Sequence, residues 1–203
     1  MMLAIGAIIL VIVAGGGYYA WKTYFSQAPA ETPTPETPAV DDRATYASST
    51  LRISLKYPKD YTVDDSFSNL SVNPKKPISG VKFTIPLQTA TGTNLSADSG
   101  ISIEWLPRAK KCTGDIYLAA NVRAREVVEG NMTYSVATSS EAGAGNLYEE
   151  FVYAISSSSP CTAIRYFIHS TQFANYPPGI VIEFDRAALL ADFDKIRQSL
   201  VLQ

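Results

Sequence analysis

LYEEFVYAI (147–155) and TAIRYFIHS (162–170) are the two stretches that decide the fold of this chain. Only the short, serine-rich segment 156–160 joins them. Two apolar segments of strand length joined by so short a loop predict an antiparallel hairpin. Under this pairing, residues face each other when their numbers sum to about 317.

The sequence before this hairpin predicts further strands and one short helix. LRISLKY (51–57) alternates apolar and polar residues with period two, as in a strand with one buried face, and Pro58 ends the pattern. The loops between the predicted strands carry Gly, Pro and Asn. The other predicted strands are 61–63, 81–85, 101–106 and the hairpin 123–128 with 132–138, and a short helix is predicted over 116–120.

The chain ends in a predicted amphipathic helix. Asp185 is a suitable N-cap. Leu189, Phe193, Ile196 and Leu200 recur at helical spacing, with charged residues between them. A run of strands closed by one helix predicts an α+β domain, in which a mainly antiparallel sheet is covered by the C-terminal helix.

The N-terminal segment predicts one transmembrane helix over 1–25. Met1 to Trp21 contains no ionisable side chain, and aromatic residues gather at its end beside Lys22. The alternative is a cleaved secretory signal peptide, although no basic residue precedes the apolar run. The partner predicted for this segment is the lipid bilayer. Lys22 alone would favour a cytoplasmic C-terminal end.

Residues 26–44 form a predicted Pro-rich linker. Their prolines are spaced by Ala, Thr and Glu, which favours an extended spacer. Residues 45–203 then form the predicted α+β domain. The acidic linker and the cysteine pair favour a domain outside the cytoplasm, in the periplasm or at the cell surface.

The composition excludes several classes of function. A net charge of −2 argues against a nucleic-acid partner. One His and two Cys cannot supply a tetrahedral Cys/His zinc site, and we expect no metal and no cofactor. Cys112 and Cys161 are predicted to form a disulfide if the domain is exported, and to be two separate thiols if it is cytoplasmic.

Two parts of the sequence resemble known proteins. The opening ISLKYPKDY (53–61) and the closing FDKIRQSL (193–200) resemble the two ends of PsbP-like domains. The segments 90–96, 145–150 and 166–179 resemble an uncharacterised group of bacterial membrane-anchored envelope proteins. The first resemblance implies an α/β/α sandwich around an antiparallel sheet, and neither implies a known activity.

The central hairpin carries the candidate catalytic residues Glu150, Arg165 and His169. The predicted pairing places all three on one face of the sheet. A carboxylate beside an imidazole is a possible general base, with Arg165 holding an anion. The alternative is a half-buried, ion-paired patch. It is favoured because the sequence has no Gly-x-Ser-x-Gly elbow and no phosphate-binding loop of the Gly-Lys-Ser/Thr type.

The segment with Asn175, Tyr176 and Pro177 is a candidate interaction loop, or simply the crossover from the sheet to the last helix. The leading hypothesis for function is a non-enzymatic, membrane-tethered module that binds or helps assemble an envelope protein partner. The alternatives are a hydrolase on the Glu150, Arg165 and His169 face, or a small-ligand-binding domain. The last hypothesis places its pocket between sheet and helix, lined by four aromatic residues: Tyr148, Tyr153, Tyr166 and Phe193.

Overall fold

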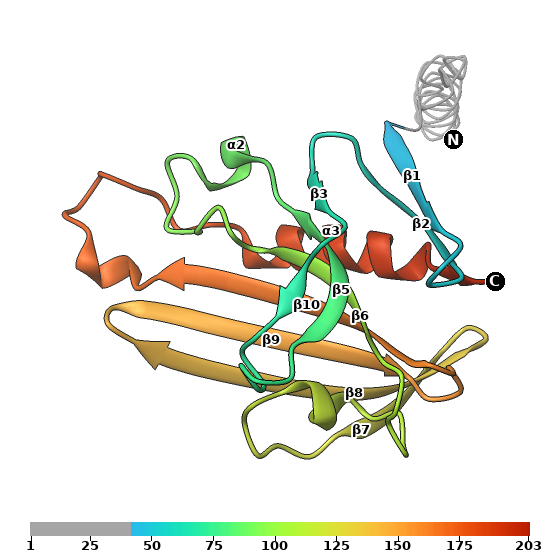
Figure 1. Cartoon of the computed structure of the whole chain (residues 1–203). Coiled ribbons are helices and arrows are strands. Elements are labelled where there is room, and N and C mark those ends of the chain that lie inside the picture. Colours follow the sequence, from blue (N-terminus) through green and yellow to red (C-terminus); the bar gives the residue numbers. More distant parts are fainter. Residues whose placement is uncertain (1–41) are drawn as a thin grey trace, which may run out of the picture. The chain divides into compact units, whose positions relative to one another are not determined.

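The computed structural model describes residues 42–203 as one unit of the chain (Figure 1). The predicted anchor 1–25 and nearly all of the predicted linker 26–44 lie outside the described residues. Within 42–203, no helix has the length and apolar character needed to cross a bilayer.

A large antiparallel sheet forms the centre of this unit. Its strands follow the spatial order β3-β5-β6-β10-β9-β8-β7, and β4 also pairs with β5. The long strands β8, β9 and β10 lie side by side in Figure 1. The strands are β3 (Thr62–Asp64), β4 (Ser68–Asn69), β5 (Ile78–Thr84), β6 (Gly100–Leu106), β7 (Arg125–Glu129), β8 (Met132–Gly143), β9 (Asn146–Ile155) and β10 (Cys161–Thr171).

A second, three-stranded sheet and a helix cover one face of the large sheet. The small sheet has the order β1-β2-β11 and is built from β1 (Arg43–Ser48), β2 (Ile53–Pro58) and β11 (Val201–Leu202). Leu55 of β2 and Phe83 of β5 belong to the same buried apolar cluster as Phe193 of helix α3 (Arg186–Gln198). This cluster is the main hydrophobic core.

Helix α3 is positioned by its cap and by its apolar stripe. The Asp185 carboxylate accepts a hydrogen bond from the Ala188 amide at 2.9 Å and so caps the helix. Leu189, Phe193 and Ile196 are buried against the sheet. The predicted N-cap and three of the four stripe residues are therefore confirmed, whereas Leu200 is buried just beyond the end of the helix.

The opposite face is covered by an irregular segment that contains η1 (Gly114–Tyr117), a single turn of 3-10 helix. Tyr117 is fully buried in a second, smaller cluster with Val152 and Ala163. The predicted Cys112–Cys161 disulfide ties this segment to the start of β10, with an S–S distance of 2.11 Å. Residues 42–203 contain no second long helix. Their other helical segments are each about one turn long: α2 (Leu87–Ala90), η1 and η2 (Phe173–Asn175).

The antiparallel sheet and C-terminal helix that the sequence predicts are confirmed, with two differences. Of the helical layers that an α/β/α sandwich implies, residues 42–203 contain a long helix on one face only. The structured part also begins earlier than residue 45, because β1 starts at Arg43 and pairs with β2. No strand was predicted there, since RATYAS (43–48) has little apolar character and is held by its partner strand.

Candidate functional site

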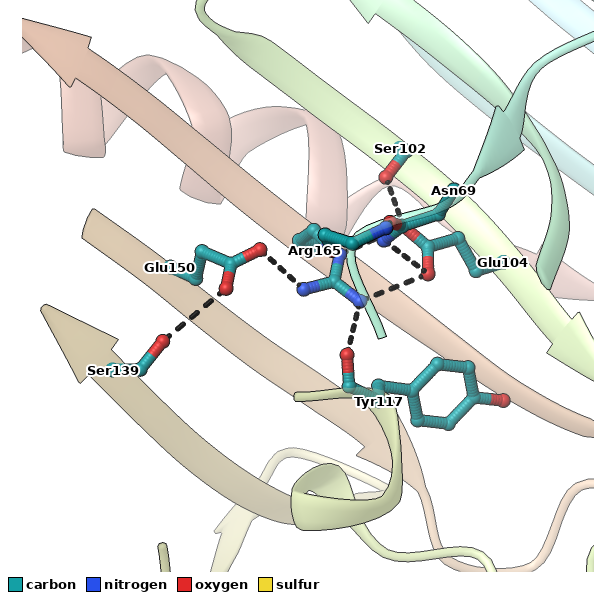
Figure 2. Close-up of polar contacts among 8 residues, drawn as sticks. Asn69, Ser102, Glu104, Tyr117, Ser139, Glu150 and Arg165 are labelled. Atoms are coloured by element: carbon teal, nitrogen blue, oxygen red, sulfur yellow. Dashed lines mark hydrogen bonds and ion pairs between the residues drawn. The ribbon is translucent and has the colours of Figure 1, made fainter. Parts of the chain in front are cut away.

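Arg165 lies at the centre of a buried polar cluster on the face opposite α3 (Figure 2). Its guanidinium binds Glu104 of β6 through two hydrogen bonds, from Nε at 2.8 Å and from Nη2 at 3.0 Å. Nη1 donates to Glu150 of β9 at 2.6 Å, and Nη2 also donates to the backbone carbonyl of Tyr117. Arg165 is therefore held by both neighbouring strands and by η1.

The strand register explains why these residues meet. In the structure Arg165 faces Val152, Glu150 faces Phe167 and Tyr148 faces His169 across β9 and β10. This is the pairing predicted from the hairpin loop. Glu104 comes from β6, the other neighbour of β10. It pairs with Ala163 and therefore lies diagonally across from Arg165.

The cluster is deeply desolvated, and its charges are paired. The side chain of Glu104 is fully buried, and it also accepts hydrogen bonds from Ser102 at 2.8 Å and from Asn69 at 3.3 Å. Burial by itself lowers the pKa of Arg165, but the charges and hydrogen bonds of Glu104 and Glu150 outweigh it, so the pKa is raised. Arg165 therefore stays charged and is bound by both carboxyl groups.

A recess of about 280 Å³ opens above this cluster. Arg165 and Glu150 line its floor, together with Ser102 and the β4 segment 67–71. The ammonium of Lys82 lies 5.8 Å from the ring centre of Phe67 and 5.4 Å from that of Phe167. The recess thus combines apolar ring surface with convergent charged groups, the usual character of a ligand site.

Lys82 is held in place at the side of this recess. Its Nζ donates a hydrogen bond to the backbone carbonyl of Asp98 at 2.7 Å. Burial lowers the pKa of Lys82, although the charges of Asp98 and Asp64 oppose this shift. Its ammonium therefore has a fixed position between the Asp98 carbonyl and the two rings.

His169 lies apart from the Arg165 cluster. Its Nδ1 is 2.8 Å from the Asp98 carboxylate, and its ring stacks on Tyr148 with centres 4.5 Å apart. It forms no hydrogen bond with Glu150 or Arg165, and its buried Nε2 has no hydrogen-bond partner among residues 42–203. Of the three candidate catalytic residues, Glu150 and Arg165 are therefore in contact, whereas His169 contacts the carboxylate of Asp98.

The hydroxyl groups around Arg165 donate to carboxylates. Ser139 donates to Glu150 at 3.2 Å, and Ser102 donates to Glu104. A serine nucleophile is activated by an imidazole base within hydrogen-bond distance, and neither of these hydroxyl groups has one. No three His, Cys, Asp or Glu side chains of residues 42–203 gather as metal ligands. The cluster is suited to binding and positioning more than to covalent chemistry.

The predicted interaction loop is the crossover between β10 and α3. Asn175 ends η2, and its side-chain amide donates to the Gly145 carbonyl at 3.0 Å, which fixes the crossover to the β8–β9 turn. Tyr176 is half-buried and Pro177 is exposed. This segment contributes no residue to the recess above Arg165.

The predicted aromatic pocket between sheet and helix is not formed. Tyr166 packs against Tyr153 and Phe193, with ring centres 5.1 and 5.3 Å apart, and both Tyr166 and Phe193 are buried. Tyr148 lies on the opposite face, against His169. These rings fill the core because the helix lies directly on them.

The polar residues that the sequence did not reveal include Asn69, Lys82 and Asp98, which line the recess, and Glu104, which binds Arg165 beneath it. The alternation in GISIEWL (100–106) was a usable signal for Glu104, because it places that residue with Ser102 on the face opposite Ile101 and Ile103. What the sequence could not reveal was that β6 pairs with β10, since no short hairpin joins them.

No family model and no curated protein match the sequence. The structure is similar to a protein of Bacteroides thetaiotaomicron with a TM-score of 0.45 and 10% identity, over 80% of this chain and 49% of that one, so this chain spans about half its length. It is also similar to cyanobacterial PsbP (CyanoP) of Synechocystis with a TM-score of 0.33 and 12% identity, over 85% of this chain and 99% of that one. PsbP, the fold that the sequence motifs resemble, is thus among the solved structures to which this chain is similar.

Proposed function

We propose that this chain is a membrane-tethered, extracytoplasmic binding module that takes a group of a partner or a small ligand into the recess above Arg165. Residues 1–25 would serve as its anchor and 26–44 as its spacer. The bound group would have an apolar body for Phe67 and Phe167 and a polar end for Lys82 and Glu150.

The observation that carries this proposal is the preformed floor of the recess. Arg165 makes four hydrogen bonds to groups on three different elements, so the polar floor is fixed before anything binds. A fixed site loses little conformational entropy on binding. Leu70 at the recess is 53% exposed, and it offers apolar contact to an incoming group.

The disulfide supports the extracytoplasmic part of the proposal. Structural disulfides persist in oxidising compartments and are rare in the cytosol. The Cys112–Cys161 bond closes a loop of 49 residues that includes η1. It therefore also supports the Tyr117 carbonyl that binds Arg165.

The test is recovery of a partner from detergent-solubilised membranes by the full chain. Lys82→Gln removes the ammonium at the recess, and Lys59→Gln is the matched control, since Lys59 is exposed and paired with Asp42. We expect a stoichiometric protein or small molecule that is retained by the unchanged chain and the control and lost with Lys82→Gln. Equal recovery by all three chains, or no retained species, would contradict the proposal.

A hydrolase is the second candidate, and one observation favours it. The Asp98 carboxylate orients the His169 ring through Nδ1, as in a catalytic triad, and Nε2 has no partner in the described chain; because Nε2 is buried, a substrate would reach it only after a local opening. The test is turnover of a panel of ester and phosphoester substrates. If the chain is a hydrolase, it should turn over one of these substrates, and His169→Gln should remove that activity. Absence of turnover by the unchanged chain would exclude a hydrolase for these substrates.

A further inference from the structure

A cluster of exposed cations lies on the loops that cover the smaller core, away from the recess. We call it the basic loop surface. It belongs to segments 73–77 and 107–126, which also contain two carboxylates, Asp115 and Glu126. Its seven members are Lys75, Lys76, Arg108, Lys110, Lys111, Arg123 and Arg125, and all are exposed.

The apolar neighbours of these cations bring the loops together. Val72, Ala109, Val122 and Ala124 pack against the buried cluster around Tyr117, so the basic residues beside them in the sequence face solvent. Lys111, Arg123 and Arg125 also line one shallow groove next to Cys112. The basic residues of these separate segments therefore surround the same small core.

These cations lack the ion pairs that five other cations of the domain make. Arg165, Arg186 and Arg197 are paired with carboxylates, as are the exposed Lys59 and Lys195. Within residues 42–203, none of the seven forms a salt bridge. The domain as a whole has balanced charge, so this local excess is a feature of one surface.

The surface is held on a fixed framework. The Cys112–Cys161 disulfide joins it to β10, and the Tyr117 hydroxyl donates to the Cys161 carbonyl at 2.7 Å. Gly114 lies so close to the β8 and β9 backbones that an added Cβ would be 2.7 Å from the Ala137 nitrogen. Lys111, Arg123 and Arg125 thus line one groove on a fixed framework, an arrangement that favours binding of a surface with several negative charges.

We propose that the basic loop surface docks on anionic lipid headgroups of the membrane to which the chain is tethered. The proposal rests on the membrane tether proposed above. An extended 26–44 linker would span about 60 Å at roughly 3.1 Å per residue, which keeps the bilayer within reach. Each Lys or Arg near an anionic bilayer contributes about 1 kcal/mol, roughly a fivefold change in the docked-to-free ratio.

The experiment uses energy transfer from Trp105 to dansyl-labelled lipid in vesicles that contain the full chain. Trp105 is in β6, directly before the basic segment, and Trp21→Phe leaves it as the single tryptophan. Flotation first checks that the chain stays with the vesicles, which tests the tether alone. We expect energy transfer to be higher in vesicles with phosphatidylglycerol than in vesicles of phosphatidylcholine alone. The transfer should decrease when the salt concentration is raised from about 0.1 M to about 1 M, because the screening length of the charges becomes shorter.

Two variants with four substitutions each separate the effect of this surface from that of total charge. The first changes Lys110, Lys111, Arg123 and Arg125 to Gln and should abolish the increase in energy transfer with phosphatidylglycerol. The control changes Arg43, Arg52, Lys59 and Lys195 to Gln, which removes the same charge from other surfaces and should keep it. Equal transfer in both lipids, or equal loss in both variants, would overturn the proposal. Binding of soluble polyphosphate without any lipid effect would overturn it too, in favour of an anionic polymer.

Discussion

Two arginine side chains are buried on opposite faces of the large sheet, and each is only 3% exposed. Arg165 on β10 is bound by strand neighbours and opens onto a recess. Arg197 on α3 is bound by Tyr166 at 2.7 Å, Asp194 at 2.9 Å and Glu129 at 2.7 Å. Its guanidinium lies 4.3 Å from the ring centre of Tyr153.

The partners of the two arginines differ in burial. Glu104 and Glu150 of the Arg165 cluster are 0% and 19% exposed, whereas Glu129 and Asp194 of the Arg197 cluster are 36% and 40% exposed. The carboxylates around Arg197 therefore keep part of their contact with water, whereas Glu104 has none and Glu150 has little. Arg197 thus joins the helix to the sheet, while Arg165 joins three elements beneath a recess.

The largest expected effect is the loss of Glu104. Glu104→Ala leaves Arg165 buried with one carboxylate, which should cost about 3–5 kcal/mol of unfolding free energy. Glu129→Ala on the other face should cost about 1 kcal/mol or less, because Glu129 is itself partly exposed to water and Arg197 keeps its second carboxylate, Asp194. Chemical denaturation followed by circular dichroism measures both. Equal costs would remove the distinction between the two clusters.

The helix face should depend more on apolar packing than on Arg197. Phe193 is fully buried, and Phe193→Ala should cost about 3–5 kcal/mol. Asp192→Ala, on the exposed side of α3, should cost under about 0.5 kcal/mol. The same denaturation experiment compares them, and a mild Phe193→Ala would mean that α3 does not close the core.

The disulfide should stabilise the Arg165 face. Cys112→Ala should lower the unfolding free energy by about 2–4 kcal/mol, because the unfolded chain is no longer constrained and η1 is released. Alkylation under denaturing conditions should find no free thiol in the exported chain. Two reactive thiols would contradict both the bond and the extracytoplasmic location.

Alkaline pH should weaken the fold through buried tyrosines. Burial, followed by its hydrogen bond with Asp65, raises the pKa of Tyr46 to about 12, and burial also raises the pKa of Tyr166 beside Arg197. The unfolded chain loses these protons near pH 10, so the stabilisation is complete below that pH and is lost as the pH rises towards the folded values. Tyr166, which is buried, should contribute a slope of about 1.4 kcal/mol per pH unit there, whereas the partly exposed Tyr46 should contribute less.

Tyr166→Phe tests this pH dependence on the Arg197 face. It removes one titrating hydroxyl, so the fall in stability above pH 10 should become shallower than in the unchanged chain. Denaturation at several alkaline pH values measures the slope. A slope that does not change would show that Tyr166 ionises equally in both states.

The local pattern predicted those parts of the fold that depend on neighbours in sequence. The hairpin of β9 and β10, its register and the cap and stripe of α3 follow from loop length and periodicity. Strand β1 and the pairing of β6 with β10 do not, because they depend on contacts between distant segments. The site was therefore predicted in part: Glu150 and Arg165 lie on one hairpin, whereas Glu104 and Lys82 are on other strands.

Site-specific photo-crosslinking tests the proposed binding recess most directly. A photo-reactive amino acid is placed at Leu70, beside the recess and 53% exposed, or at Val201 of the small sheet, 57% exposed, as the matched control. In cells that make the full chain, we predict a discrete adduct from position 70 that Lys82→Gln removes, and none from position 201. No adduct at position 70, or the same adducts from both positions, would contradict a binding site above Arg165.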